Sequence, residues 1–221
     1  MPLWEESIPL MREGYHKKIR DLAYGPAAKG QKVYPPPELV FNAMRQTPFT
    51  EVRVVILGQD PYINEFNNIP EAHGLCFSVR QGLPVPPSLK NIFKEIQNSI
   101  YPGTPHNFST DLTRWAKQGV LLLNASLSVL AGKSNSHADL GWHQLTDNII
   151  ETVSAQKEHV VFMLWGAFAQ KKETLIDKRK HLVLKTSHPS PLSAHRGFLG
   201  SGVFVKCNAY LQEHGLKEVM W

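Results

Sequence analysis

The chain has 221 residues, 42% of them hydrophobic and 19% charged, which is typical of one globular domain. Two cysteines are too few for a disulfide framework or a four-thiolate metal site, and no apolar run is long enough to cross a bilayer. The 24 Lys and Arg against 19 Asp and Glu give a formal charge of +5, which weakly favours a polyanionic partner.

We predict a single domain over residues 1–221, in which residues 1–35 form an N-terminal helix and a connector. The connector belongs to a Pro/Gly-rich segment at 24–40, and a short helix is expected over 36–46. The N-terminal segment has no apolar core of the kind found in signal peptides. We therefore expect an intracellular protein, cytoplasmic or nuclear according to its host, without a membrane partner.

Four apolar runs indicate buried strands, and amphipathic patterns between them indicate helices. The strands are expected at 52–58, 119–127, 159–166 and 181–188, and the helices at 87–100, 142–156 and 166–178, with Ser88 as a plausible N-cap. Continuous apolar strands alternating with helices are typical of a parallel sheet covered on both faces. The sequence thus predicts an α/β fold with a central four-stranded parallel sheet and helices on both faces.

Polar residues follow these strands where each one ends: "GQDPY" (58–62), Asn124, "WGA" (165–167) and "SHPSPLS" (187–193). In open α/β sheets, sites form outside the carboxyl ends of the strands. A carboxylate, a carboxamide, an imidazole and several hydroxyls should therefore meet at one edge of the sheet. The sequence has no P-loop, no H-E-x-x-H motif and no nucleobase-deaminase signature, and these motifs offer no second carboxylate for a glycosidase pair.

The segment "HPSPLSAHR" (188–196) must be a surface loop, because its two prolines suit neither a helix nor a central strand. It holds Leu192 among small polar residues. Taken alone, this leucine is better explained as a side chain folded back onto the core than as an exposed functional residue.

Together, "GQDPY", "AHGLCFSV", "PPSLKNI", "GVLLLNASLSV", "LWGAFAQKK" and "HPSPLSAHRGFLG" resemble the motifs of the family-1 uracil-DNA glycosylases, in the same order from about residue 35 to the C-terminus. The resemblance implies base-excision DNA repair: uracil is flipped out of DNA and its bond to deoxyribose is hydrolysed, leaving an abasic site. The implied partners are uracil-containing DNA, single- or double-stranded, and a protein inhibitor of the family. A monomer without metal or cofactor is expected.

The resemblance also implies roles for individual residues. Asp60 would stabilise the sugar cation and orient the attacking water, while His188 would donate a hydrogen bond to uracil O2 as negative charge develops there. The uracil-binding residues would be Gln59, Tyr62, Phe77 and Asn124. Leu192 would enter the duplex where the flipped base was. With the resemblance, an exposed functional role for this leucine is therefore favoured over one in which it folds back onto the core. The remaining DNA contacts would come from Ser88, Ala167, Ser190, Ser193 and Arg196.

The sequence departs from the family pattern after Tyr62. A histidine usually follows this tyrosine, but here the residue is Ile63, and the loop 63–71 is about four residues longer than usual. Isoleucine cannot hydrogen-bond a water or a phosphate. The longer loop, which contains Phe66, is therefore a hypothetical source of a substitute or a new contact. Two alternatives stay open: a catalytically impaired DNA-binding module on the same fold, and an enzyme with a shifted base preference.

Overall fold

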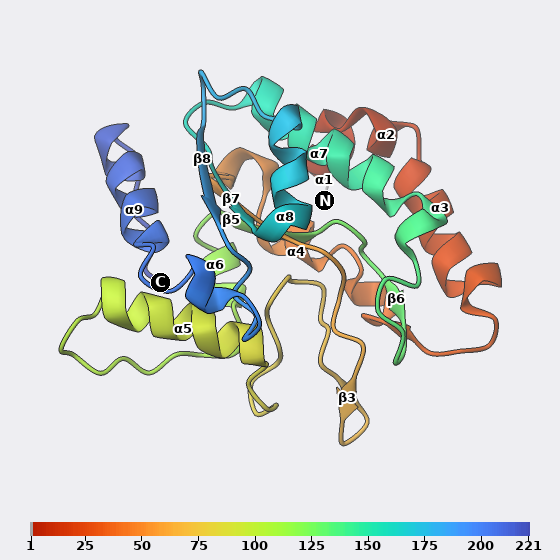
Figure 1. Ribbon diagram of the computed structural model, residues 1–221. Coiled ribbons are helices and arrows are strands. Elements are labelled where there is room, and N and C mark those ends of the chain that lie inside the picture. The colour runs from red at the N-terminus through yellow and green to blue at the C-terminus, as the bar shows by residue number, and fades with distance from the viewer. Residues whose placement is uncertain (1) are drawn as a thin grey trace.

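The computed structural model describes residues 2–221, and its centre is a four-stranded parallel sheet in the order β5-β2-β7-β8 (Figure 1). The strands are β2 (Val54–Gly58), β5 (Val120–Asn124), β7 (Val161–Trp165) and β8 (Leu182–Thr186). Every residue of β2, β5 and β7 is buried, whereas β8 is an edge strand and is partly exposed. The predicted sheet is confirmed, and each strand is shorter than its apolar run.

Helices cover both faces of the sheet. In Figure 1, α5 (Pro87–Ser99) and α9 (Val203–Glu213) lie on one side, and α7 (Trp142–Gln156) lies on the other with the N-terminal helices. The single N-terminal helix expected from the sequence is instead divided into α1 (Pro2–Ser7), α2 (Pro9–Arg12) and α3 (Tyr15–Tyr24). Pro9 at the first break, before α2, and a left-handed Gly14 (φ 74°) at the second break, before α3, account for the division.

The shorter elements position the loops around the sheet. They are the helices α4 (Asn42–Gln46), α6 (Thr113–Ala116) and α8 (Gly166–Gln170), the strand pair β1 (Val33–Tyr34) and β6 (Val129–Leu130), the strand pair β3 (Glu65–Phe66) and β4 (Ile69–Pro70), and 3-10 turns at Pro26–Ala28, Pro37–Leu39, Phe49–Glu51, Ala138–Leu140, Lys171–Leu175 and Ala194–Arg196. The helix expected over 166–178 is therefore α8 followed by a 3-10 turn.

The expected N-cap at Ser88 is wrong. Helix α5 begins at Pro87, so its N-cap position is Pro86, and Ser88 lies inside the first turn without a capping hydrogen bond. Proline at the first helical position has the required φ and needs no partner for an N–H. In residues 2–221, no helix combines the length and the apolar character needed to cross a membrane.

Candidate active site

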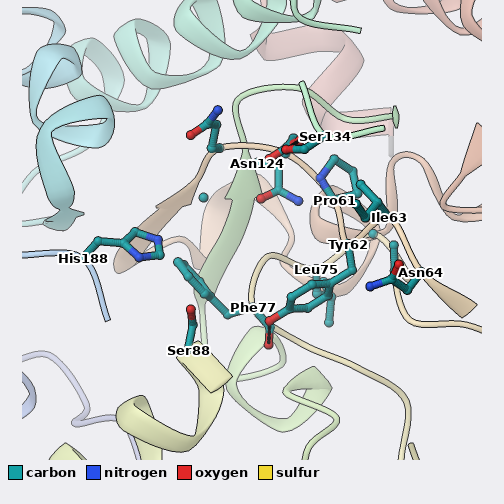
Figure 2. A pocket seen from close by; sticks show the side chains of 15 residues that line it. Pro61, Tyr62, Ile63, Asn64, Leu75, Phe77, Ser88, Asn124, Ser134 and His188 are labelled. Carbon is teal, nitrogen blue, oxygen red and sulfur yellow. Dashed lines mark hydrogen bonds between the residues drawn. The ribbon is translucent and has the colours of Figure 1, made fainter. Parts of the chain in front are cut away.

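A cavity of about 290 Å³ opens at the carboxyl ends of the central strands (Figure 2). Seven of the residues predicted from sequence line it: Gln59, Asp60, Tyr62, Phe77, Ser88, Asn124 and His188. The lining is completed by Gly58, Pro61, Ile63, Asn64, Ala72, Gly74, Leu75 and Ser134. The parallel sheet therefore brings the chemically unlike strand ends to one place, as expected.

Asn124 reaches the cavity because its neighbour on β2 has no side chain. It is the last residue of β5 and pairs with Gly58 in the sheet register. A Cβ at Gly58 would lie 2.2 Å from Asn124 Oδ1 and 2.8 Å from the Cβ of Cys76. Figure 2 shows the Asn124 amide directed into the cavity, where it offers both a donor and an acceptor.

Two aromatic residues form another wall of the cavity. Phe77 has a left-handed backbone (φ 63°), unusual for an aromatic residue, and its ring centre lies 5.3 Å from Trp165 and 5.8 Å from His188. The Tyr62 hydroxyl donates a hydrogen bond of 3.1 Å to the Phe77 carbonyl. Burial raises the pKa of Tyr62, so the phenol stays protonated and keeps this bond.

A hydrogen bond to the His188 ring fixes its tautomer. The backbone N–H of Ser190 donates to Nδ1 at 3.1 Å, so Nδ1 carries no proton and, in the neutral ring, the proton is on Nε2. Burial also lowers the pKa of His188, which favours this neutral form. A Cβ at Gly166 would come within 2.9 Å of the His188 Cβ, so glycine there allows the histidine its place. His188 can therefore offer an Nε2–H donor without carrying a charge.

The Asp60 carboxylate is held by a loop that is distant in sequence. Its Oδ2 accepts hydrogen bonds from the Ser134 hydroxyl at 2.9 Å and from the backbone N–H of Asn135 at 2.6 Å. The neighbouring Gln59 side chain, which is exposed, reaches Asn135 Oδ1 at 3.5 Å. The backbone carbonyl of Gln59 accepts a hydrogen bond from the N–H of Ser126. The carboxylate therefore has a defined orientation within the cavity.

The loop after His188 is held together by serine hydroxyls. Ser193 Oγ donates to the His188 carbonyl at 2.9 Å and lies 3.1 Å from Ser190 Oγ. From α5, the Asn91 amide donates to the Pro189 carbonyl at 2.8 Å. Leu192 stands 83% exposed at the tip, so the alternative in which it folds back onto the core is wrong.

Apart from Ser88, the other predicted DNA contacts do not line the cavity. Ser190 and Ser193 are half-buried in the loop, while Arg196 is exposed after them. Ala167 is exposed near the start of α8, the helix that follows β7. Ala167 lies in the segment that directly follows β7, and the other three lie in the segment that directly follows β8. The two strands pair in parallel from Val161 opposite Leu182 to Trp165 opposite Thr186, so these segments start at the same edge of the sheet.

The family model described as the Uracil DNA glycosylase superfamily matches residues 44–212. The chain belongs to this family. It is 51% identical over 219 residues to the uracil-DNA glycosylase of Azotobacter vinelandii, covering 99% of this chain and 92% of that protein. The uracil-DNA glycosylase of Pseudomonas savastanoi pv. phaseolicola is 47% identical over 221 residues, with coverage of 100% and 94%.

Solved structures agree with the sequence relatives. Mimivirus uracil-DNA glycosylase matches with a TM-score of 0.85 and 28% identity, over 100% of this chain and 86% of that one. A point variant of mimivirus UNG in complex with UGI matches with a TM-score of 0.86 and 30% identity, over 94% and 82%. These matches establish the fold, the enzyme class and a function in the repair of uracil in DNA. The alternative of a catalytically impaired DNA-binding module is not supported.

The departure from the family pattern at Ile63 has a structural explanation. Its side chain packs against a small apolar cluster of Tyr34, Ala72 and Val129. Its carbonyl accepts a hydrogen bond from Gly132 N at 2.8 Å, so its backbone supports the loop that holds Asp60. Position 63 therefore has an apolar packing role in this member of the glycosylase family.

The longer loop forms the β3–β4 hairpin, which projects beyond the sheet in Figure 1. Its turn residues Asn67 and Asn68 have φ of 50° and 61°, a left-handed turn that asparagine tolerates well. Phe66 pairs with Ile69 across the hairpin, and the two side chains are 44% and 42% exposed. The hypothetical contact residue Phe66 is therefore available on the surface, two residues after the cavity-lining Asn64.

Sequence reasoning missed the residues that hold Asp60, namely Ser134 and Asn135. They lie more than 70 positions further along the chain, in a polar loop with no pattern of its own. The φ of Phe77 is equally invisible in the sequence. Within residues 2–221, no group of three or more His, Cys, Asp or Glu has the arrangement of a metal site.

Proposed function

We propose that this cavity receives a uracil flipped out of DNA, and that Asp60 and His188 carry the hydrolysis. The observation that supports the proposal is the meeting of one carboxylate, one carboxamide and one neutral imidazole at the cavity, with Leu192 exposed on the loop that follows the imidazole. Each group has the chemistry that one part of the reaction needs.

The Asn124 amide recognises the base. In one orientation it accepts from uracil N3–H and donates to uracil O4, whereas cytosine presents an acceptor and a donor at these places. Each buried group left unpaired costs about 1 to 3 kcal/mol, which favours uracil. Phe77 stacks on the base, and the backbone of Gln59 contacts it. Tyr62, fixed by its bond to the Phe77 carbonyl, occupies the space that the thymine methyl would need.

His188 and Asp60 act on the two fragments of the breaking bond. As the bond between uracil and deoxyribose lengthens, negative charge grows on the base and positive charge on the sugar. The His188 Nε2–H donates to uracil O2, an electrostatic contribution that is commonly worth ~10²- to 10³-fold in rate. Asp60 faces the cationic sugar and orients the water that adds to it, so the products are free uracil and an abasic site.

The loop 188–196 grips the DNA and keeps the base out of the stack. Its serines, together with Ser88 and Ala167, contact phosphates through hydroxyl or backbone N–H groups, which position the strand without reading its sequence. Arg196 adds positive charge near the backbone. Leu192 enters the stack as an apolar wedge. The protein acts as a monomer, and the UGI complex of a mimivirus relative supports binding of such a protein inhibitor.

Single-turnover release of uracil from a labelled oligonucleotide, measured in EDTA, tests the proposal. The wild type should release uracil rapidly, and Asp60→Asn and His188→Ala should each lose at least ~10²-fold. Oligonucleotides with cytosine or thymine at the same position should not react. Binding without release in the wild type, or full rates in both variants, would show that these residues do not carry the reaction.

A further inference from the structure

We propose that Ser134 is a positioning residue for the reaction, one that holds a single oxygen of the Asp60 carboxylate and thereby aims the other at the cavity. The inference rests on the proposed role of Asp60. It concerns a residue that lies in a different loop and that neither stacks on nor pairs with the base.

The contact geometry carries the inference. Ser134 Oγ donates to Asp60 Oδ2 at 2.9 Å, and the N–H of Asn135 donates to the same oxygen at 2.6 Å. Oδ1 is engaged by neither donor. Two donors on one carboxylate oxygen fix both side-chain torsions of the aspartate, so Oδ1 has one direction in which to meet the sugar or the water. Figure 2 shows Ser134 at the edge of the cavity near Pro61.

The loop that carries Ser134 is itself anchored on both sides. Gly132 N donates to the Ile63 carbonyl at 2.8 Å, and the Ser136 hydroxyl accepts from Leu130 N at 2.8 Å. Asn135 has a left-handed backbone (φ 60°). These contacts set the path of the loop without the Ser134 side chain, so the Ser134 hydroxyl is available to hydrogen-bond Asp60.

The surroundings of Ser134 argue against a merely structural role. The residue is exposed, so its hydroxyl is not required to satisfy a buried polar group. Ser136, two residues further, shows the structural use of a serine in this loop, because its hydroxyl completes a backbone hydrogen bond. Ile63, three residues after Asp60, has no polar atom in its side chain to offer the carboxylate.

The effect should lie in the chemical step and not in DNA binding. A carboxylate already oriented does not need to reorganise when positive charge develops on the sugar, which is the basis of electrostatic preorganisation. Loss of one charge-assisted hydrogen bond should lower the rate about tenfold, which corresponds to about 1.4 kcal/mol in the barrier.

The matched pair Ser134→Thr and Ser134→Val tests this, because the two side chains have the same shape and only threonine keeps the hydroxyl. Single-turnover uracil release is measured against enzyme concentration, which separates the maximal rate from the half-saturating concentration. Ser134→Val should lower the maximal rate about tenfold with an unchanged half-saturating concentration and thermal midpoint, and Ser134→Thr should restore the rate. Equal rates in the Thr and Val variants would overturn the proposal.

The same substitution in an Asp60→Ala background shows whether Ser134 acts through the carboxylate. Ser134→Val should then have no further effect on the residual rate, because the oxygen that it positions is gone. The same tenfold loss in this background would overturn the positioning role. If Asp60→Ala keeps the wild-type rate, the proposed role of Asp60 fails. If Asp60→Ala loses its activity while the Ser134→Thr and Ser134→Val variants have equal rates, only the positioning role of Ser134 fails.

Discussion

Substitution of Gly58 by alanine should disable the cavity without replacing any side chain that would contact uracil. The added Cβ would lie 2.2 Å from Asn124 Oδ1, whereas ordinary contacts begin near 3.4 Å. The amide must therefore retreat by about 1 Å, and a displacement of this size can cost about 10²-fold in rate. Gly58 ends a buried strand and its φ lies outside the left-handed region, so the backbone itself tolerates alanine.

The same Cβ would also approach the Cβ of Cys76 at 2.8 Å. Overpacking of this kind costs about 1 to 3 kcal/mol of unfolding free energy, which a domain of ordinary stability withstands. Urea denaturation should therefore show a folded protein with a modestly lower midpoint. Single-turnover uracil release should show the loss of about 10²-fold or more.

The Asn124→Ala background separates the two contacts. It removes the oxygen that Gly58→Ala displaces, so the added methyl should have little further effect on the residual rate. A loss of the same size in this background would mean that the methyl acts through Cys76 or the sheet. A folded Gly58→Ala variant with the wild-type rate would refute the role of the Asn124 amide position.

Three further predictions concern the loop, the hairpin and the histidines. Leu192→Gly should keep the wild-type thermal midpoint, because the side chain is 83% exposed, and should lose more activity on duplex than on single-stranded uracil DNA; equal losses would refute the wedge. Phe66→Ser should raise the half-saturating DNA concentration without changing stability if the hairpin contacts DNA, and an unchanged value would remove that hypothesis. Burial lowers the pKa of His73 and of His188, so the folded state binds protons less readily than the unfolded chain. The unfolding free energy should therefore have its full value above about pH 6.5. Below that pH it should decrease by up to about 1.4 kcal/mol per pH unit for each histidine. Urea titrations that show no decrease between pH 7.5 and pH 5.5 would contradict this.

The sequence by itself determined the sheet and the composition of the site. Continuous apolar runs such as "VRVVILG" are typical of strands buried on both faces of a covered parallel sheet, and the four predicted strands are the four of the central sheet. The polar residues that end these runs then lie close together, because the carboxyl ends of parallel strands are at one edge of the sheet. The loop at 188–196 was equally readable, since two prolines exclude regular structure.

The tertiary structure decided how those side chains are held. The division of the N-terminal helix follows from local residues, but the clamp on Asp60 by Ser134 depends on the path of a loop more than 70 residues away. The space for Asn124 depends on its register opposite Gly58, and the direction of Phe77 depends on a backbone conformation that its residue type disfavours. Local patterns encode which atoms are buried and where strands end, whereas the orientation of a single carboxylate or amide is set by contacts between segments whose proximity exists only after folding.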